Sequence, residues 1–163
     1  MASSFSSSGS VPDAPRKYDV FISFRSEIRN SLASHLYTAL ERAFLKVFRD
    51  DKKLETSNEI TPSLNQAIKD SSVSVIVFSE DYASSKWCLD EVDQIMQFRK
   101  DEGQYVIPIF YKVDPRDVRK QTGAYEKAFE KHEIDYHPDR VKRWRAALSD
   151  AGKLIGKHCQ TST

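Results

Sequence analysis

The stretch "SVSVIVFSEDYASSKWCLDEVDQIMQFRK", residues 72–100, decides the fold. It begins with a nearly continuous run of apolar residues, which is typical of a strand covered on both faces of a parallel sheet. A short polar segment follows, and residues 86–100 then place Val92, Ile95 and Met96 at the spacing of one helix face. A buried strand that leads directly into an amphipathic helix predicts a βα unit.

The same alternation extends to both sides of this stretch. The apolar patterns predict strands at 17–24, 45–50, 72–79 and 105–113, and helices at 31–44, 62–71, 86–100, 123–133 and 138–155. No hairpin signal joins successive strands, so the sequence predicts an α/β fold in which a parallel sheet carries helices on both faces. A fifth strand is expected near the edge of the sheet, without a segment assigned to it.

Composition is typical of a single globular domain. The chain has 163 residues, of which 39% are hydrophobic and 30% charged, and its formal net charge is +1. This balance gives no global attraction to nucleic acid or to an anionic membrane, and no apolar run approaches the ~18 residues of a membrane helix. Cys88 and Cys159 form neither a disulfide framework nor a metal-ligand spacing. We therefore expect a reduced, intracellular protein without a metal site.

The domain boundaries follow from the change of pattern near residue 17. Residues 1–16 are rich in serine and lack an apolar core, so we expect a solvated, disordered leader rather than a secretory signal. The folded domain is expected over residues 17–156. Residues 157–163 are then expected to be a C-terminal tail, at the start of a linker.

Ligands on parallel sheets bind beyond the carboxyl ends of the strands, where the strand order reverses. The loops after Phe24, Asp50, Ser79 and Val113 are therefore the candidate site regions. The chain has no dinucleotide-binding glycine motif, Walker lysine, zinc-protease motif or nucleophile elbow. A phosphoacceptor receiver domain is also excluded, because it requires acids just after the first strand and at the end of the third. Here Asp19 lies inside the first strand and Ser79 ends the third.

Glu91 is the most informative candidate residue. It falls ~100° from the apolar stripe of its helix, at the edge of that stripe and within the second turn. The partial positive charge of the helix N-terminus favours an ionised carboxylate there, and Trp87 offers an aromatic wall one turn earlier. Such a carboxylate can stabilise a developing cation. The alternative is a glutamate at the helix edge that pairs with a lysine.

Two other segments allow either a functional or a purely structural interpretation. The loop after the first predicted strand carries Arg25, Glu27 and Arg29, which form either a solvated charged loop or an anion site at a helix entrance. On the next helix, Ser34 and His35 lie away from the apolar face. They are either surface residues without a partner or contact residues between two helices across a symmetric interface.

Five segments together resemble the TIR (Toll/interleukin-1 receptor) domain of plant disease-resistance proteins. The segments are "YDVFISFRSEIRNSLASHLYTAL", "FRDDKKLETSNEI", "VIVFSEDYASSKWCLDEV", "VIPIFYKVDPRDVRKQTGAYEKAF" and "RVKRWRAAL". They occur in the order found in that family and cover about residues 17–156. The resemblance implies a flavodoxin-like three-layer fold, with a five-stranded parallel sheet flanked by helices.

The resemblance also implies an NAD⁺ glycohydrolase that self-association switches on, with NAD⁺ as its substrate and no prosthetic group. In the family motif S-x-x-W-C-x-x-E the glutamate is catalytic, and here the motif consists of Ser84, Trp87, Cys88 and Glu91. The family's nucleotide-facing segment corresponds to Ser23, Phe24, Arg25, Ser26 and Glu27. Ser84 and Trp87 are expected to belong to the same nucleotide pocket.

The resemblance further implies a contact surface between copies of the domain. Ser34 and His35 on the first helix, together with Trp144 on the last, correspond to one symmetric contact. The expected partners are other TIR domains and the nucleotide-binding and leucine-rich-repeat domains of a longer chain, in the cytoplasm or nucleus. No membrane or nucleic-acid partner is expected. An adaptor that signals through TIR–TIR contacts without catalysis is the alternative to the enzyme.

Two departures from the family pattern concern glycines. The family's F-R-G-E-D-T-R reads "FRSEIR" here, with Ser26 in place of the glycine and one residue fewer before Arg29. Ser57 replaces a second glycine within the polar connection at 49–64, which is expected to be a mobile binding loop. A serine at positive φ costs roughly 1 kcal/mol. The changes are therefore expected to impair the nucleotide pocket and to leave catalysis weak, absent or dependent on assembly.

Overall fold

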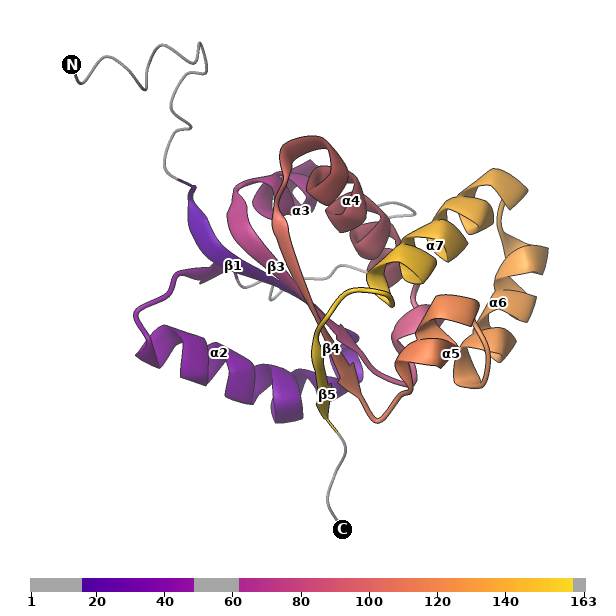
Figure 1. Cartoon of the computed structure of the whole chain (residues 1–163), viewed down its shortest axis with the longest axis horizontal. Coiled ribbons are helices and arrows are strands. Elements are labelled where there is room, and N and C mark those ends of the chain that lie inside the picture. Colours follow the sequence, from indigo (N-terminus) through magenta and orange to yellow (C-terminus); the bar gives the residue numbers. More distant parts are fainter. Residues whose placement is uncertain (1–15, 49–61, 160–163) are drawn as a thin grey trace.

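The computed structural model describes residues 16–48 and 62–159. They form a five-stranded sheet in the order β2-β1-β3-β4-β5, with parallel pairing throughout (Figure 1). The strands are β1 (Tyr18–Ser23), β2 (Val47–Phe48), β3 (Ser71–Phe78), β4 (Tyr105–Tyr111) and β5 (Lys157–Cys159). Because β2 and β3 lie on opposite sides of β1, the strand order reverses at β1. The expected α/β fold is confirmed.

Helices connect the strands, as the alternating pattern predicts. The helices are α2 (Ser34–Arg42), α3 (Pro62–Lys69), α4 (Lys86–Glu102), α5 (Pro115–Lys120), α6 (Ala124–Asp135) and α7 (Pro138–Ala151). A 3-10 turn η1 (Ser26–Ile28) and a π turn η2 (Arg29–Ala33) precede α2, and a second 3-10 turn η3 (Tyr82–Ser84) precedes α4. The helix predicted at 31–44 is therefore shorter than expected, because its first residues belong to the π turn.

Alternate residues of the strands supply two hydrophobic clusters, one on each face of the sheet. In β1, Val20 and Ile22 join the cluster beneath α2, whereas Phe21 joins the cluster on the other face. This second cluster is the larger one, and it includes buried residues of α3, α4 and α7. Consequently α2 and α7 pack on opposite faces of the sheet.

The sequence pattern does not locate two of the elements, although it leads us to expect a fifth strand near the edge of the sheet. One is α5, which begins after Asp114; this side chain caps the helix by accepting a hydrogen bond from the Arg116 N–H at 2.8 Å. The other is β5, which pairs with β4 between Ile109 and Tyr111. Because β5 lies within the segment expected to be a tail, the folded domain extends beyond residue 156.

The face of the sheet beside α2 is covered unevenly. Tyr105 and Ile107 of β4 point to the same face as the buried Ile109, yet they remain 76% and 42% exposed. Within residues 16–48 and 62–159, α2 and the turns before it are the only helical segments that bury side chains in this cluster. The beginning of β4 thus presents an apolar strip to solvent.

Candidate functional site

The carboxyl ends of β1, β3 and β4 border a small cavity of about 180 Å³. Its lining consists of Glu27, Ile28, Ser79, Glu80, Asp81, Tyr111 and Lys112. The loop after β1 meets the loop after β3 here, since the Ser79 hydroxyl donates to Glu27 Oε1 at 3.2 Å. Glu27 also pairs with Arg25, with 3.4 Å between Oε2 and Nε. The cavity lies at the edge of the sheet where ligands bind in this class of fold.

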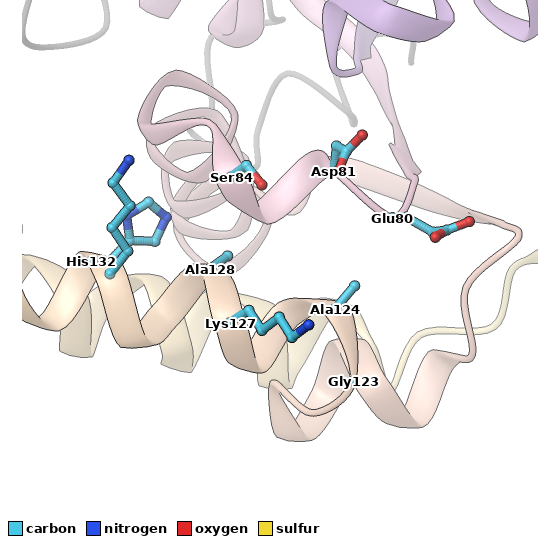
Figure 2. A pocket seen from close by; sticks show the side chains of 9 residues that line it. Glu80, Asp81, Ser84, Gly123, Ala124, Lys127, Ala128 and His132 are labelled. Atoms are coloured by element: carbon cyan, nitrogen blue, oxygen red, sulfur yellow. The ribbon is translucent and has the colours of Figure 1, made fainter.

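A larger cavity of about 730 Å³ lies between α6 and the turn that follows β3 (Figure 2). Its lining includes Ser84 but not Glu91. Glu80 and Asp81 come from the turn, and Lys127 comes from α6 (Figure 2). This mixed-charge cavity is therefore separate from the carboxylate to which the motif points.

Glu91 lies inside the molecule rather than at the edge of the apolar stripe. Its side chain is 0% exposed. The hydroxyl of Ser23, the last residue of β1, donates to Glu91 Oε1 at 2.6 Å. The predicted position at the edge of the helix face is therefore wrong. The carboxylate instead joins α4 to the carboxyl end of β1, the strand at which the sheet order reverses.

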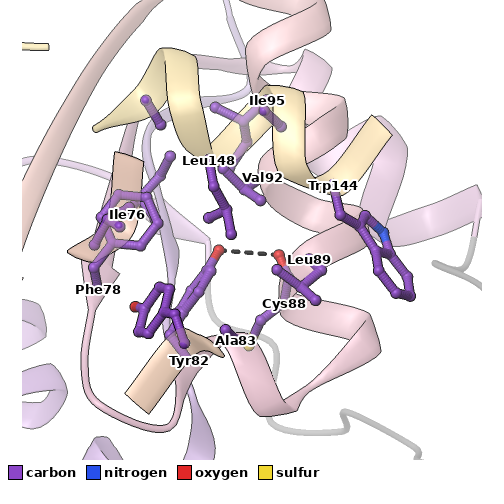
Figure 3. Packing of buried hydrophobic residues seen from close by; sticks show 14 of the residues in the cluster. Ile76, Phe78, Tyr82, Ala83, Cys88, Leu89, Val92, Ile95, Trp144 and Leu148 are labelled. Atoms are coloured by element: carbon purple, nitrogen blue, oxygen red, sulfur yellow. Dashed lines mark hydrogen bonds between the residues drawn. The ribbon is translucent and has the colours of Figure 1, made fainter. Parts of the chain in front are cut away.

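Tyr82 extends this contact into a buried network. Its hydroxyl lies 2.8 Å from Ser23 Oγ and donates to the Cys88 carbonyl at 3.0 Å (Figure 3). Burial raises the pKa of Tyr82 well above its ordinary value, and nearby Cys88 and Glu91 raise it further. The phenol therefore keeps its proton. The network joins the end of β1, the turn η3 and the first turns of α4.

Sequence reasoning did not identify Tyr82 as part of the site. The residue lies in the loop after β3, one of the candidate regions, but the pattern of apolar residues does not reveal where its hydroxyl points. Its ring packs edge-on against Phe78, with 5.0 Å between centroids. The signal that could have identified it is a tyrosine placed two residues before the serines at the start of the helix.

The motif residues of η3 and α4 range from the surface to the interior. Ser84 is exposed. Trp87 is half-buried, and Lys86 Nζ lies over the Trp87 ring, 4.7 Å from its centroid. Cys88 is buried, and its Sγ contacts the Phe24 carbonyl at 3.5 Å. Ser85 caps the helix, because its hydroxyl accepts a hydrogen bond from the Cys88 N–H at 3.2 Å. The cap fixes the first turn of the helix and thereby the position from which Glu91 reaches Ser23.

Two residues of the predicted nucleotide-facing segment point into the molecule. Ser23 is buried and holds Glu91. Phe24 is 2% exposed and its ring packs edge-on against Tyr37 of α2, with 6.2 Å between centroids. The expectation that the Phe24 side chain faces a nucleotide is therefore not supported, because this ring belongs to the core. Arg25 and Glu27 remain partly exposed beside the small cavity.

The backbone at Ser26 is not strained. The non-glycine residues with positive φ in the described ranges are Phe44, Lys112 and Gln121. Ser26 is not among them, and its side chain is exposed. The expected cost of replacing the family glycine therefore does not arise at this position. Ser57 and the predicted loop at 49–61 lie outside the described residues.

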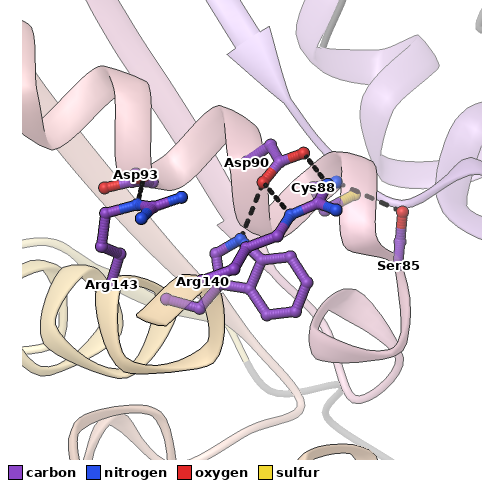
Figure 4. Close-up of polar contacts among 7 residues, drawn as sticks. Ser85, Cys88, Asp90, Asp93, Arg140 and Arg143 are labelled. Atoms are coloured by element: carbon purple, nitrogen blue, oxygen red, sulfur yellow. Dashed lines mark hydrogen bonds and ion pairs between the residues drawn. The ribbon is translucent and has the colours of Figure 1, made fainter. Parts of the chain in front are cut away.

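The residues predicted for self-association do not share one surface. Ser34 and His35 are exposed on α2. Trp144 is 0% exposed, and its Nε1–H donates to Asp90 Oδ1 of α4 at 2.8 Å (Figure 4). Since α2 and α7 also pack on opposite faces of the sheet, a contact surface that contains all three residues is not formed. Trp144 stabilises the packing of α7 on α4 instead.

Two further observations concern possible ligands and membranes. In the described part of the chain, no group of three or more His, Cys, Asp or Glu side chains is placed to hold a metal ion. Likewise, none of the described helices has the length and apolar character that a membrane span requires.

Comparison with known sequences identifies related proteins. A profile of the TIR domain matches residues 17–163. The chain is 51% identical over 156 residues to disease resistance protein RPV1 of Vitis rotundifolia, and 48% identical over 142 residues to TMV resistance protein N of Nicotiana glutinosa. These matches cover 94% and 85% of this chain but only 11% and 12% of the relatives. The chain thus spans about a tenth of the length of the curated relatives it matches.

Comparison with solved structures gives a consistent result. The chain is similar to the TIR domains in the structure of the activated Roq1 resistosome directly recognizing the pathogen effector XopQ. The TM-score is 0.78, with 41% sequence identity, and the match covers 87% of each chain.

Proposed function

This chain belongs to the TIR domain family of plant disease-resistance proteins, and on that premise we propose that it cleaves NAD⁺ as a signal in plant defence. The products are nicotinamide and an ADP-ribose-type nucleotide. One observation carries the proposal: the buried carboxylate of Glu91 meets Ser23 at the end of β1, where the strand order reverses. Parallel sheets form their ligand sites at such positions.

The chemistry of the bond explains why a carboxylate suits this site. Cleavage between the nicotinamide nitrogen and the ribose carbon develops positive charge on the sugar, as in glycoside hydrolysis. Nicotinamide takes the bonding electron pair and leaves as a neutral molecule, so no general acid is required. Water then adds to the sugar carbon and loses a proton. Glu91 stabilises the cationic sugar, and a surrounding of low dielectric constant strengthens that interaction.

The reaction requires the site to open, because Glu91 is closed to solvent in this conformation. We assign this opening to assembly of several copies. The similarity to TIR domains from an activated resistosome supports an assembled active form, and exposed Ser34 and His35 offer a contact surface on α2. A longer chain with nucleotide-binding and leucine-rich-repeat domains is the expected setting, since the relatives extend far beyond the matched segment.

Release of nicotinamide by the purified domain tests the proposal. Glu91→Ala is expected to lower the rate by about 100-fold or more, because it removes the group that stabilises the transition state. Glu102→Ala, an exposed glutamate at the far end of the same helix, is the matched control and should retain the wild-type rate. The wild-type rate should rise faster than linearly with protein concentration. Full activity of a folded Glu91→Ala variant would exclude Glu91 as the catalytic residue.

The burial of Glu91 favours a second candidate function, that of a non-catalytic adaptor. In this case Glu91 is a structural residue that holds β1 against α4, and the domain signals through contacts between copies. The two functions differ in one measurement. An assembled wild-type domain that releases no nicotinamide at any concentration would support the adaptor and exclude the enzyme.

A further inference from the structure

Ser23 lies between two oxygen atoms, each of which can accept its single proton. Its Oγ is 2.6 Å from Glu91 Oε1 and 2.8 Å from the hydroxyl oxygen of Tyr82. The Cys88 carbonyl, 3.0 Å from the same phenol, can only accept, so the proton of Tyr82 is directed to it. The Tyr82 oxygen is then an acceptor, and it competes with Glu91 for the proton of Ser23.

The competition cannot be relieved by ionisation of the phenol or by solvent. Tyr82 is 0% exposed, and burial raises its pKa well above the ordinary value. With Glu91 ionised, three contacts share two hydroxyl protons. With Glu91 protonated, its proton goes to Ser23, the serine proton goes to Tyr82, and all three contacts are satisfied. The network with Tyr82 therefore favours the neutral form of Glu91 more than a hydrogen bond from Ser23 without Tyr82 would.

We propose that Tyr82 is a positioning residue for Glu91, and that it acts through Ser23 by drawing the serine proton away from the carboxylate. The inference deepens the proposed function and rests on it for its catalytic meaning. A carboxylate that receives less stabilisation from its own serine retains more of its negative charge for the cationic sugar. Tyr82 thus sets the reactivity of Glu91 through the hydroxyl of Ser23.

Other charged groups around α4 are engaged in pairs that do not include Ser23. On the α7 side, Asp90 pairs with Arg140 and Asp93 with Arg143, and after β1 Arg25 pairs with Glu27. Cys88, Glu91 and Tyr125 are the titratable groups whose charges raise the pKa of Tyr82. On α3, Lys69 is exposed.

Carbon-13 NMR of the side-chain carboxyl groups measures the titration midpoint of Glu91 directly, with Glu91→Gln identifying its signal. Tyr82→Phe removes the competing oxygen and keeps the ring that packs on Phe78. We expect it to lower the midpoint, because the serine proton then serves the carboxylate alone. Ser23→Ala removes that donor and should raise the midpoint. Both shifts are expected to be on the order of one pH unit.

The double variant shows whether Tyr82 acts through Ser23. Since the serine carries the effect, adding Tyr82→Phe to Ser23→Ala should produce no further decrease. Tyr125→Phe is the matched control: this phenol is equally buried and donates to the Ser79 carbonyl at 2.8 Å. It should leave the midpoint of Glu91 unchanged. The pH profile of nicotinamide release provides a second readout, and its acid limb should move to lower pH in Tyr82→Phe.

Three results would overturn the inference. The first is a midpoint that rises or stays constant in Tyr82→Phe. The second is a Tyr82→Phe shift that persists undiminished without Ser23. The third is a titration midpoint of Glu91 that is unchanged or lower in Ser23→Ala. This third result is sufficient to overturn the inference if Tyr82→Phe does not fold. The expected shifts without any nicotinamide release would contradict the proposed function and leave the proton competition intact. Nicotinamide release without the shifts would contradict the proton competition and leave the proposed function intact.

Discussion

His132 of α6 lies among the rings of three aromatic side chains and contacts a backbone carbonyl. Its ring centroid is 5.5 Å from that of Phe129 and 5.2 Å from that of Trp144, and its Nε2 is 2.7 Å from the Ala83 oxygen. Burial lowers the pKa of His132, although the hydrogen bond to Ala83 opposes the shift. The folded domain therefore holds this histidine neutral at a pH where the unfolded chain begins to protonate it.

The lowered pKa of His132 predicts a loss of stability on acidification. Below the ordinary histidine pKa of about 6.5, the unfolded chain binds more protons than the folded one, so the free energy of unfolding falls with pH. His132→Gln keeps a donor for the Ala83 carbonyl but cannot titrate. Urea unfolding of this variant should therefore change less between about pH 7 and 5.5 than that of the wild type. His35→Gln, at an exposed position on α2, should retain the wild-type dependence; an unchanged dependence in His132→Gln would contradict the prediction.

Individual side chains show where sequence reasoning stops. The helical period places Glu91 beside the buried face of its helix, but it does not show that a hydroxyl on β1 draws the carboxylate inside. The family pattern assigns Trp144 to a contact surface, whereas Asp90 on another helix holds it in the core. In both pairs, Glu91 with Ser23 and Trp144 with Asp90, the two residues are far apart in the sequence. Local periodicity cannot specify such pairs, because it describes one element at a time.

The packing of α7 on α4 depends on one polar cluster. Asp90 Oδ2 lies 2.5 Å from Arg140 Nη2, and its other oxygen accepts the hydrogen bond of Trp144 (Figure 4). The side chains of Arg140 and Asp90 are 18% and 13% exposed. A neighbouring pair, Arg143 with Asp93, is more open, at 61% and 31%. Two similar aspartates on one helix therefore have different energetic roles.

Neutralising these aspartates should have different consequences for stability. Asp90→Asn removes the carboxylate charge that pairs with the largely buried guanidinium of Arg140, and should lower the free energy of unfolding by about 2 kcal/mol. Burial raises the pKa of Asp93 despite the attraction of Arg143, so its charge is unfavourable in the fold at neutral pH. Asp93→Asn should therefore leave stability unchanged or increase it. Urea denaturation at neutral pH measures both, and equal losses in the two variants would refute this distinction.

At the scale of elements, strong periodicity predicts well and short segments do not. The apolar pattern locates β1, β3 and β4, and it locates α3, α4, α6 and α7 within a few residues of their ends. β5 has three residues, too few for any period to show, and it exists because it pairs with β4. α5 is also short, although Asp114 and Pro115 carry a recognisable helix start.

The two faces of the whole sheet differ in their cover. α3, α4 and α7 pack on one face, whereas α2 with the turns before it buries side chains on the other (Figure 1). Tyr105 and Ile107 lie where this second cover ends, with 76% and 42% of their surface exposed. Contiguous apolar surface of this kind commonly marks a site of association.

The exposed strip on β4 predicts that the described domain binds hydrophobic dyes and self-associates weakly. Tyr105→Thr combined with Ile107→Thr removes the apolar surface and places β-branched residues, which suit a strand, at both positions. We expect lower binding of an anilinonaphthalene dye and a lower apparent mass in sedimentation, with little change in the free energy of unfolding. Glu102→Thr, also exposed, should change none of these. An undiminished apparent mass in the double variant would show that the strip has no part in association.

The hydrogen-bonded path from Glu91 through Ser23 and Tyr82 returns to the helix from which it started, at the carbonyl of Cys88. Because Ser23 joins the other two side chains, a substitution at any one of these positions changes the hydrogen bonds available to the other two. On the proposed coupling, a substitution at position 82 alone therefore alters the acid strength of Glu91. Anyone who engineers a silent or a hyperactive version of the domain would accordingly have to redesign the strand end, the turn and the helix start as a single unit.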